Sequence, residues 1–106
     1  MPKYLISASY SAEGLRGLQR DKASGRRQAI TTAIEGVGGK LECIYYALGE
    51  DDVYVVADMP DNVAAAAIGI AVSAAGLVRT RTTALMTVEE VDRALERTIN
   101  YRAPGR

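Results

Sequence analysis

The stretch that decides the fold is residues 40–59, KLECIYYALGEDDVYVVADM. Two runs rich in apolar, β-branched and aromatic residues flank an acidic turn, GEDD, at Gly49–Asp52. Runs of this composition joined by a short turn that contains glycine predict a β-hairpin. The second run, VYVVAD, is the most apolar of the predicted strands, so we expect it to lie in the centre of a sheet.

Before the hairpin, KYLISAS at residues 3–9 predicts a first strand. Gly14 and Gly17 weaken any helix after that strand, so we expect a loose helical turn and then a polar loop over QRDKASG. A firmer helix is predicted from Ser24 to Gly36, where apolar residues recur at helical spacing and glycines come next.

After the hairpin, Pro60 and Asp61 mark the start of an alanine-rich helix that ends at Gly76. That helix is apolar almost all round, so we expect it to be buried on more than one side. LVRTRTTALM predicts a fourth strand, and TVEE at Thr87–Glu90 is a capping box that starts a last helix.

The predicted order is β-α-β-β-α-β with an extra C-terminal helix. Right-handed crossovers turn this order into a ferredoxin-like α+β sandwich, with an antiparallel sheet of strand order 4-1-3-2 and both main helices on one face. We expect a single domain over residues 3–99 and a flexible tail over residues 100–106.

Composition argues against several classes of function. The 13 basic residues equal the 13 acidic ones, which argues against nucleic-acid and membrane binding. One cysteine and no signal-peptide pattern favour a cytoplasmic protein. With no histidine in the chain, zinc and haem sites are disfavoured, and GEDD lacks the spacing of a known calcium loop. We therefore expect no metal and no cofactor.

Strand alternation predicts a mixed surface on the sheet face that the helices leave open. In that prediction Cys43 and Tyr45 point towards the helices, and Cys43 is a buried structural thiol. The open face combines apolar side chains with polar ones: Leu5, Ile44, Leu48, Val56 and Leu85 beside Ser7, Glu42, Tyr46, Tyr54, Asp58, Arg79 and Arg81. Such a face is too apolar for water, so we expect a second copy of the chain to cover it.

The polar members of this face are the candidate ligand-pocket residues: Ser7, Glu42, Tyr46, Tyr54, Asp58, Arg79 and Arg81. Buried charges need partners, and the prediction pairs Glu42 and Asp58 with the two arginines. No residue is assigned a catalytic role. A ligand would lie between the open face and a glycine-containing flap at Ser11–Lys22.

Three functions are compatible with this set. The first is a homo-oligomeric domain with a binding or structural role that holds a small ligand. The second is a cofactor-independent oxygenase or isomerase of aromatic or enolisable metabolites, in which Tyr54 donates a proton and Asp58 acts as a base. The third is a ligand-sensing module.

The chain also resembles a known family. KYLISASYSAEGL, the hairpin segment, the alanine-rich helix and RTTALMTVEEV together resemble the GYD domain family over about residues 3–95. That family is named for a Gly-Tyr-Asp type motif at the hairpin, and Asp51 stands where the tyrosine is expected. The resemblance implies a ferredoxin-like fold of the dimeric α/β-barrel type. It implies no particular activity.

Overall fold

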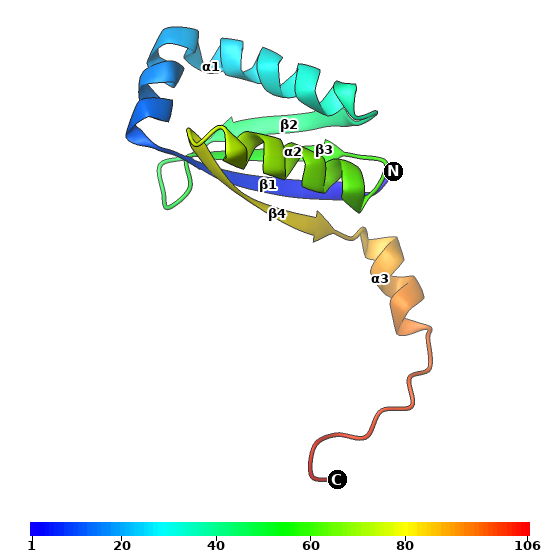
Figure 1. The fold of residues 1–106 in the computed structure, drawn as a ribbon. Coiled ribbons are helices and arrows are strands. Elements are labelled where there is room, and N and C mark those ends of the chain that lie inside the picture. The colour runs from blue at the N-terminus through cyan, green and yellow to red at the C-terminus, as the bar shows by residue number, and fades with distance from the viewer.

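The computed structural model describes residues 1–106 and contains one four-stranded sheet and three helices. In chain order the elements are β1 (Lys3–Tyr10), α1 (Ala12–Gly36), β2 (Lys40–Tyr46), β3 (Val53–Asp58), α2 (Asn62–Ala74), β4 (Val78–Leu85) and α3 (Val88–Leu95). Neighbouring strands are antiparallel in the order β2-β3-β1-β4, which reads 4-1-3-2 from the other edge. Figure 1 shows α1 and α2 together on one side of the sheet, the helix side. The opposite side, the open face, carries no element of this α+β chain.

Side-chain caps start all three helices where the sequence supplies a hydroxyl or a carboxylate. The Ser11 hydroxyl accepts a hydrogen bond from the backbone N–H of Gly14, and the Asp61 carboxylate accepts one from the N–H three residues on. At α3 the predicted capping box is confirmed, because Thr87 and Glu90 each accept from the other's backbone N–H. These bonds satisfy donors that the first turn of a helix leaves free.

The predicted polar loop before residue 26 was wrong. The structure has a helix there, and α1 changes direction at Lys22, whose φ of 64° and ψ of 166° are not helical. This backbone region is costly for a residue with a side chain. One strained residue therefore absorbs the turn that we had assigned to a loop, and the polar residues around it remain helical. The predicted end at Gly36 is confirmed.

A β-bulge interrupts the pairing of β2 with β3. Leu41 lies opposite Ala57, but the next paired residue is Cys43, which lies opposite Val56, so Glu42 is the extra residue. A bulge shifts the two-residue period of a strand by one position.

As a result, the side-chain directions predicted for the second half of β2 were wrong. Ile44 packs against the core on the helix side, and the Tyr46 hydroxyl lies 3.3 Å from that of Tyr10, also on the helix side. Cys43 and Tyr45 take their places on the open face. Neither the spacing nor the composition of β2 reveals where one residue drops out of register.

The core lies between the sheet and the two helices. It consists of nine buried apolar residues: Tyr4, Ile6, Ala8, Ile34, Val53, Val55, Ala57, Met59 and Ala65. Most of them come from the two central strands, whose inward residues were predicted correctly. At the end of α1, a Cβ on Gly39 would lie 2.5 Å from the carbonyl oxygen of Asp58, so only glycine fits the turn into β2.

The alanine-rich helix α2 is less buried than expected. Only Ala65 is fully buried, and Val63 and Ile70 are more than two-thirds exposed. Within one chain α2 therefore buries a single side, contrary to our prediction.

Helix α3 projects from the end of β4 and buries no residue (Figure 1). Its apolar positions Val88, Val91 and Leu95 are all exposed. The molecule is 57 Å long as a result, and its radius of gyration is 17.0 Å. A compact chain of this length is expected to have a radius of gyration of about 13 Å.

Candidate functional site

The open face is organised in rows of paired residues across the sheet. One row contains Tyr45, Tyr54, Ser7 and Arg81, and the neighbouring row contains Cys43, Val56, Leu5 and Thr83. A third row, at the end where α3 leaves the sheet, contains Asp58, Lys3 and Leu85. Polar groups therefore gather at the two ends of the face, with an apolar band between them.

At one end, a carboxylate is the centre of a hydrogen-bonded cluster. Asp51 is 7% exposed, although it belongs to the acidic turn Gly49–Asp52. Its Oδ2 accepts from Arg81 Nη2 at 2.5 Å and from the Tyr54 hydroxyl at 3.4 Å, and its Oδ1 accepts from the Ser9 hydroxyl at 3.2 Å. A buried carboxylate requires such donors, and here one comes from each of β1, β3 and β4. We call these four residues the Asp51 cluster.

The backbone of the turn fixes this position. The N–H of Asp52 donates to the carbonyl of Ala8, and the Asp52 carboxylate accepts from the N–H of Tyr10. The carbonyl of Asp52 accepts from the N–H of Ala47, which closes the turn. Asp52 thus extends β3 along β1, and the preceding residue is held against the end of the sheet.

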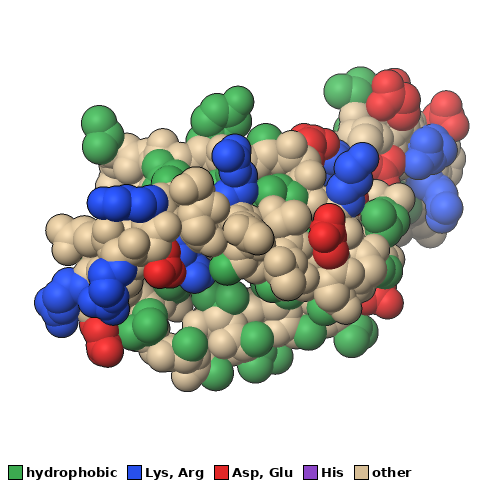
Figure 2. All heavy atoms as spheres, turned by 90° about the horizontal axis from the view of Figure 1, so that it is seen from above, with side chains coloured by type: hydrophobic (Ala, Val, Ile, Leu, Met, Phe, Trp, Pro, Cys, Tyr) green, Lys and Arg blue, Asp and Glu red, His purple; other side chains and the backbone are tan.

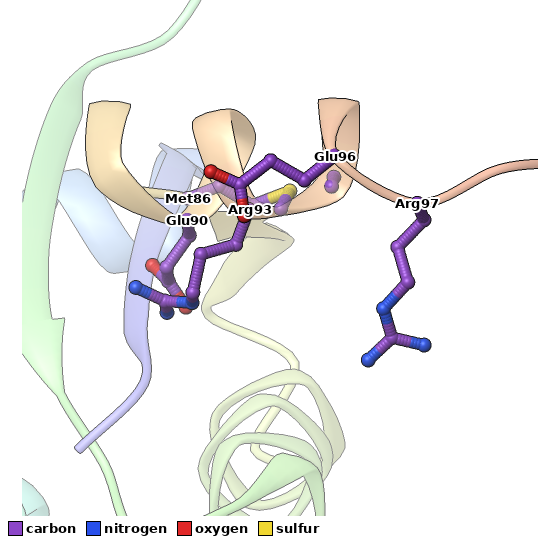
Figure 3. Close-up of a pocket in the computed structure, with 6 residues that line it drawn as sticks. Met86, Glu90, Arg93, Glu96 and Arg97 are labelled. Atoms are coloured by element: carbon purple, nitrogen blue, oxygen red, sulfur yellow. The ribbon is translucent and has the colours of Figure 1, made fainter.

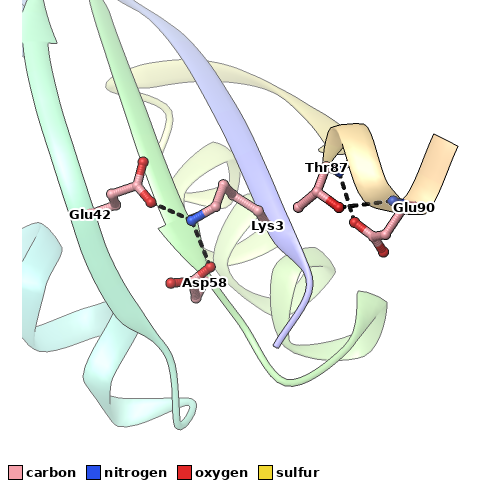
Figure 4. A network of polar contacts seen from close by, with 5 residues as sticks. All are labelled: Lys3, Glu42, Asp58, Thr87 and Glu90. Carbon is pink, nitrogen blue, oxygen red and sulfur yellow. Dashed lines mark hydrogen bonds and ion pairs between the residues drawn. The ribbon is translucent and has the colours of Figure 1, made fainter. Parts of the chain in front are cut away.

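At the other end, a lysine lies between two acids, and we call these three residues the Lys3 cluster (Figure 4). Lys3 Nζ donates to Glu42 and, at 2.9 Å, to Asp58 Oδ1. The hydrogen bond to Glu42, and then that to Asp58, raises the pKa of Lys3 above its usual value. All three side chains are partly exposed, so solvent weakens these ion pairs.

The structure brings together only some of the predicted pocket residues. Tyr54 and Arg81 meet on Asp51, with Ser7 between them in the ladder. Glu42 and Asp58 are at the opposite end and pair with Lys3 instead of with the predicted arginines.

Two other predicted pocket residues stand apart from both clusters. Tyr46 lies on the other side of the sheet because of the bulge. Arg79 shares the open face with Arg81, lies opposite Ser9 and makes no ion pair.

The Ser11–Lys22 segment does not cover the open face. It is the first part of α1, and its glycines line a cleft against α2 on the helix side. The predicted flap therefore lies on the opposite side of the sheet from all the predicted pocket residues except Tyr46.

A wide hollow of about 710 Å³ adjoins α3. Figure 3 shows Glu90 and Arg93 beside each other on the helix, whereas Arg97 points away from them. The hollow is lined by α3 and its flanking residues alone, and most of the lining is charged, so nothing in it would hold a ligand by burial.

Sequence reasoning missed the residues at the centres of the two clusters. Lys3 could have been found, since it alternates with Leu5 and Ser7 and must share their face. Asp51 could not have been found in this way, because a turn residue has no period that tells which way its side chain points.

No helix is both long enough and apolar enough to cross a membrane. Among curated proteins and among solved structures, nothing matches this chain. The GYD domain matches residues 4–95, which include every strand and helix of the structure except the first residue of β1. This match confirms the resemblance seen in the sequence, and the chain belongs to the GYD domain family.

Proposed function

We propose that the chain acts as a homo-oligomer, at least a dimer, of ferredoxin-like subunits in the dimeric α/β-barrel arrangement. The open faces of two subunits cover each other, and a small ligand binds in the space between them. The observation that carries the proposal is the Asp51 cluster, a buried and fully paired carboxylate on a sheet face that no element of its own chain covers.

The apolar band supports a cover over this face. Leu5 and Val56 are only half-buried in the single chain and lie between the two polar ends, and Leu85, also half-buried, lies in the row of Lys3 and Asp58. Covering such side chains gains about 25 cal/mol for each Å² of apolar surface removed from water. A second copy of the chain could provide this cover, because a two-fold axis would place the polar ends of its open face against polar groups of the first copy.

The exposed apolar side of α3 also supports self-association. Val88 and Leu95 are each about three-quarters exposed, and α3 comes directly after the open-face residue Leu85. A helix with an apolar stripe gains most of its stability by packing that stripe on a neighbour. In the proposed dimer, that neighbour is the second subunit.

The arginines of β4 indicate the class of ligand. Arg81 uses one nitrogen on Asp51 and its side chain is 68% exposed, so other N–H groups remain accessible. Arg79 is two residues away on the same face and makes no ion pair. Guanidinium groups bind carboxylates through paired hydrogen bonds. A small carboxylate held beside Tyr54 is therefore the proposed ligand.

Light scattering after gel filtration tests the assembly. We expect the wild-type chain to be a dimer or larger at micromolar concentration, and Val56→Lys to be a monomer because it places a charge in the centre of the apolar band. Ile70→Lys, on the exposed side of α2, is the matched control and should leave the assembly intact. A monomeric wild-type chain would overturn the proposal.

A thermal-shift series with benzoate and other small carboxylates tests the ligand. Binding to the folded state raises the melting temperature, and Arg79→Gln should remove the shift whereas Arg97→Gln should not. If no carboxylate shifts the wild-type chain, the role is structural and the ligand part of the proposal fails.

In the enzymatic alternative, the structure points to a different pair of reacting side chains. Within one subunit Tyr54 and Asp58 lie in different clusters, at opposite ends of the open face. Chemistry on this face would use Asp51 and Tyr54, whose side chains are in contact. A ligand-sensing role would use the same carboxylate site and would differ only in what the bound subunit contacts.

A further inference from the structure

The two main helices leave a gap over the middle of the sheet. Helix α1 packs mainly on β2 and α2 packs mainly on β4, and these are the two edge strands. The central strands β1 and β3 therefore form the floor of a space between the helices. Figure 2 looks down on this side, where the surface is hollowed beside the row of hydrophobic side chains on α2.

This space has an inner and an outer part. The inner part is a cavity of about 70 Å³ with a mostly apolar lining that includes Ile6, Ile30, Val55 and Ile68. The outer part is a cleft of about 330 Å³ between the first half of α1 and the end of α2. Arg26 is one of four residues that line both parts. The outer part alone reaches the lower end of the volumes found for small-molecule sites.

Arg26 carries the one buried side-chain nitrogen without a hydrogen-bond acceptor, although its side chain as a whole is 30% exposed. Its Nε has no hydrogen-bond acceptor, whereas every other buried side-chain nitrogen or oxygen has one. Its Nη1 lies 3.8 Å from Asp21 Oδ2, which is too long for a hydrogen bond. A donor that is buried without an acceptor destabilises the fold. An anion that pairs with the guanidinium would supply the missing acceptor.

A second polar pair borders the same place. The hydroxyls of Tyr10 and Tyr46 lie 3.3 Å apart, and Tyr10 lines both the cavity and the cleft. Burial, and then the contact with Tyr10, raises the pKa of Tyr46, while the nearby Arg26 acts in the opposite direction. One of the two hydroxyls donates to the other, and the remaining O–H can donate a hydrogen bond to an oxygen held by Arg26.

We propose that the cleft between α1 and α2 binds a small amphiphile, with its apolar body over the sheet and its carboxylate on the guanidinium group of Arg26. The apolar lining of the cavity favours an apolar chain in the ligand, and the missing acceptor at Arg26 favours a negatively charged group at its end. This site lies on the opposite side of the sheet from the proposed dimer interface and does not depend on it.

The outer cleft has room at one defined point. A Cβ added at Gly17, which lines the cleft, would meet nothing within 4 Å. At Gly14, by contrast, a Cβ would lie 2.1 Å from the carbonyl oxygen of Leu77, so α1 lies against the start of β4 there. Gly17→Leu is therefore expected to fold and to fill part of the cleft.

Nitrogen-15 NMR of the full wild-type chain tests the proposal directly, because the Nε–H of arginine gives its own signal. With n-octanoate as the probe, we expect the Arg26 Nε–H signal and the amides of Ile30 and Val72 to shift together and to saturate. Octylamine, which has a similar chain and the opposite charge, should produce no saturating shift. If octanoate leaves the Arg26 signal in place, or if octylamine binds equally well, the proposal is overturned.

Two variants extend the test. Arg26→Gln should weaken octanoate binding by about tenfold or more, the value of one charge-assisted hydrogen bond, while Arg20→Gln on the exposed part of α1 should not change it. Gly17→Leu should also weaken octanoate binding, although Arg26 is unchanged in this variant. The benzoate experiment tests a different site, the one that contains Arg79. The octanoate result can therefore fail or succeed independently of the dimer proposal. Unchanged octanoate affinity in both Arg26→Gln and Gly17→Leu contradicts the assignment.

Discussion

The two charged clusters of the open face are built in opposite ways. In the Asp51 cluster, one acid is 7% exposed and accepts hydrogen bonds from three strands. In the Lys3 cluster, one base with a side chain 30% exposed donates to two acids that solvent also reaches. The first cluster has a buried carboxylate at its centre, whereas the second consists of ion pairs at the surface.

The two clusters should therefore differ in how much their charged groups contribute to the stability of the fold. An exposed ion pair exchanges good hydration for a weak attraction, so its net contribution to stability is small. A buried carboxylate has lost its hydration, so its protein donors become indispensable. We therefore expect the free energy of unfolding to depend strongly on Asp51 and weakly on Lys3.

The largest effect is predicted for Asp51→Ala. The substitution removes three hydrogen bonds to a charged group and leaves Arg81, Tyr54 and Ser9 without their shared acceptor. Because Arg81 is mostly exposed and can return to water, we expect a loss of about 2–3 kcal/mol in the free energy of unfolding. Urea denaturation followed by circular dichroism measures it.

The control for this substitution is Glu50→Ala, one residue earlier in the same turn. Glu50 is exposed and makes no side-chain hydrogen bond, so its removal should change the free energy of unfolding by less than about 0.5 kcal/mol. Equal losses for the two variants would mean that the hydrogen bonds of Asp51 contribute no more to stability than an exposed residue of the same turn.

Much of the fold could be predicted from the sequence, because it depends on periodic patterns. The inward residues of β1, β3 and β4 can be derived from alternation, and the start of α3 from its capping box. The bulge at Glu42 and the bend at Lys22 could not be predicted. Each is a backbone irregularity at a single residue, and the composition of the surrounding segment gives no sign of it. The bulge nevertheless reverses the side-chain directions of the rest of β2, and the bend redirects the rest of α1.

The candidate site shows the same limit. Tyr54 and Arg81 were placed on the open face correctly, because each belongs to a regular strand. Their shared partner, Asp51, comes from a turn, where side-chain direction is set by the hydrogen bonds of Asp52 and not by any period. A site built across strands and a loop is therefore predicted only in part, and its central residue is the part that is missed.

A smaller effect, with a defined pH dependence, is predicted for Lys3→Met. Because the folded-state pKa of Lys3 is raised, its contribution is complete below the unfolded pKa of about 10.4 and disappears as the pH rises through the higher folded value. The melting temperatures of wild type and Lys3→Met should therefore differ at neutral pH and converge in strong alkali.

Lys40→Met is the matched control for the lysine. Lys40 lies opposite Asp58 in the ladder but makes no ion pair, so its removal should produce no difference that closes with rising pH. If Lys3→Met lowers stability as much as Asp51→Ala does, the contrast between the two clusters is wrong.

The smallest effect is predicted at the cap of α3, where Thr87 and Glu90 exchange two hydrogen bonds (Figure 4) that are both exposed to solvent. The backbone N–H of Thr87, which donates to the Glu90 carboxylate, lowers the pKa of that carboxylate. The stabilisation is therefore present above the unfolded pKa of about 4.3 and is lost as the pH falls through the lower folded value. Carbon-13 shifts of α3 should show helix that frays in acid in the wild type and frays already at neutral pH in Glu90→Ala, which has no acceptor for the Thr87 N–H.

Glu89→Ala, in the same turn but without a bond to the cap, is the control and should keep the wild-type pH profile. Identical profiles for Glu89→Ala and Glu90→Ala would mean that the helix dipole, and not the capping box, holds this end of α3.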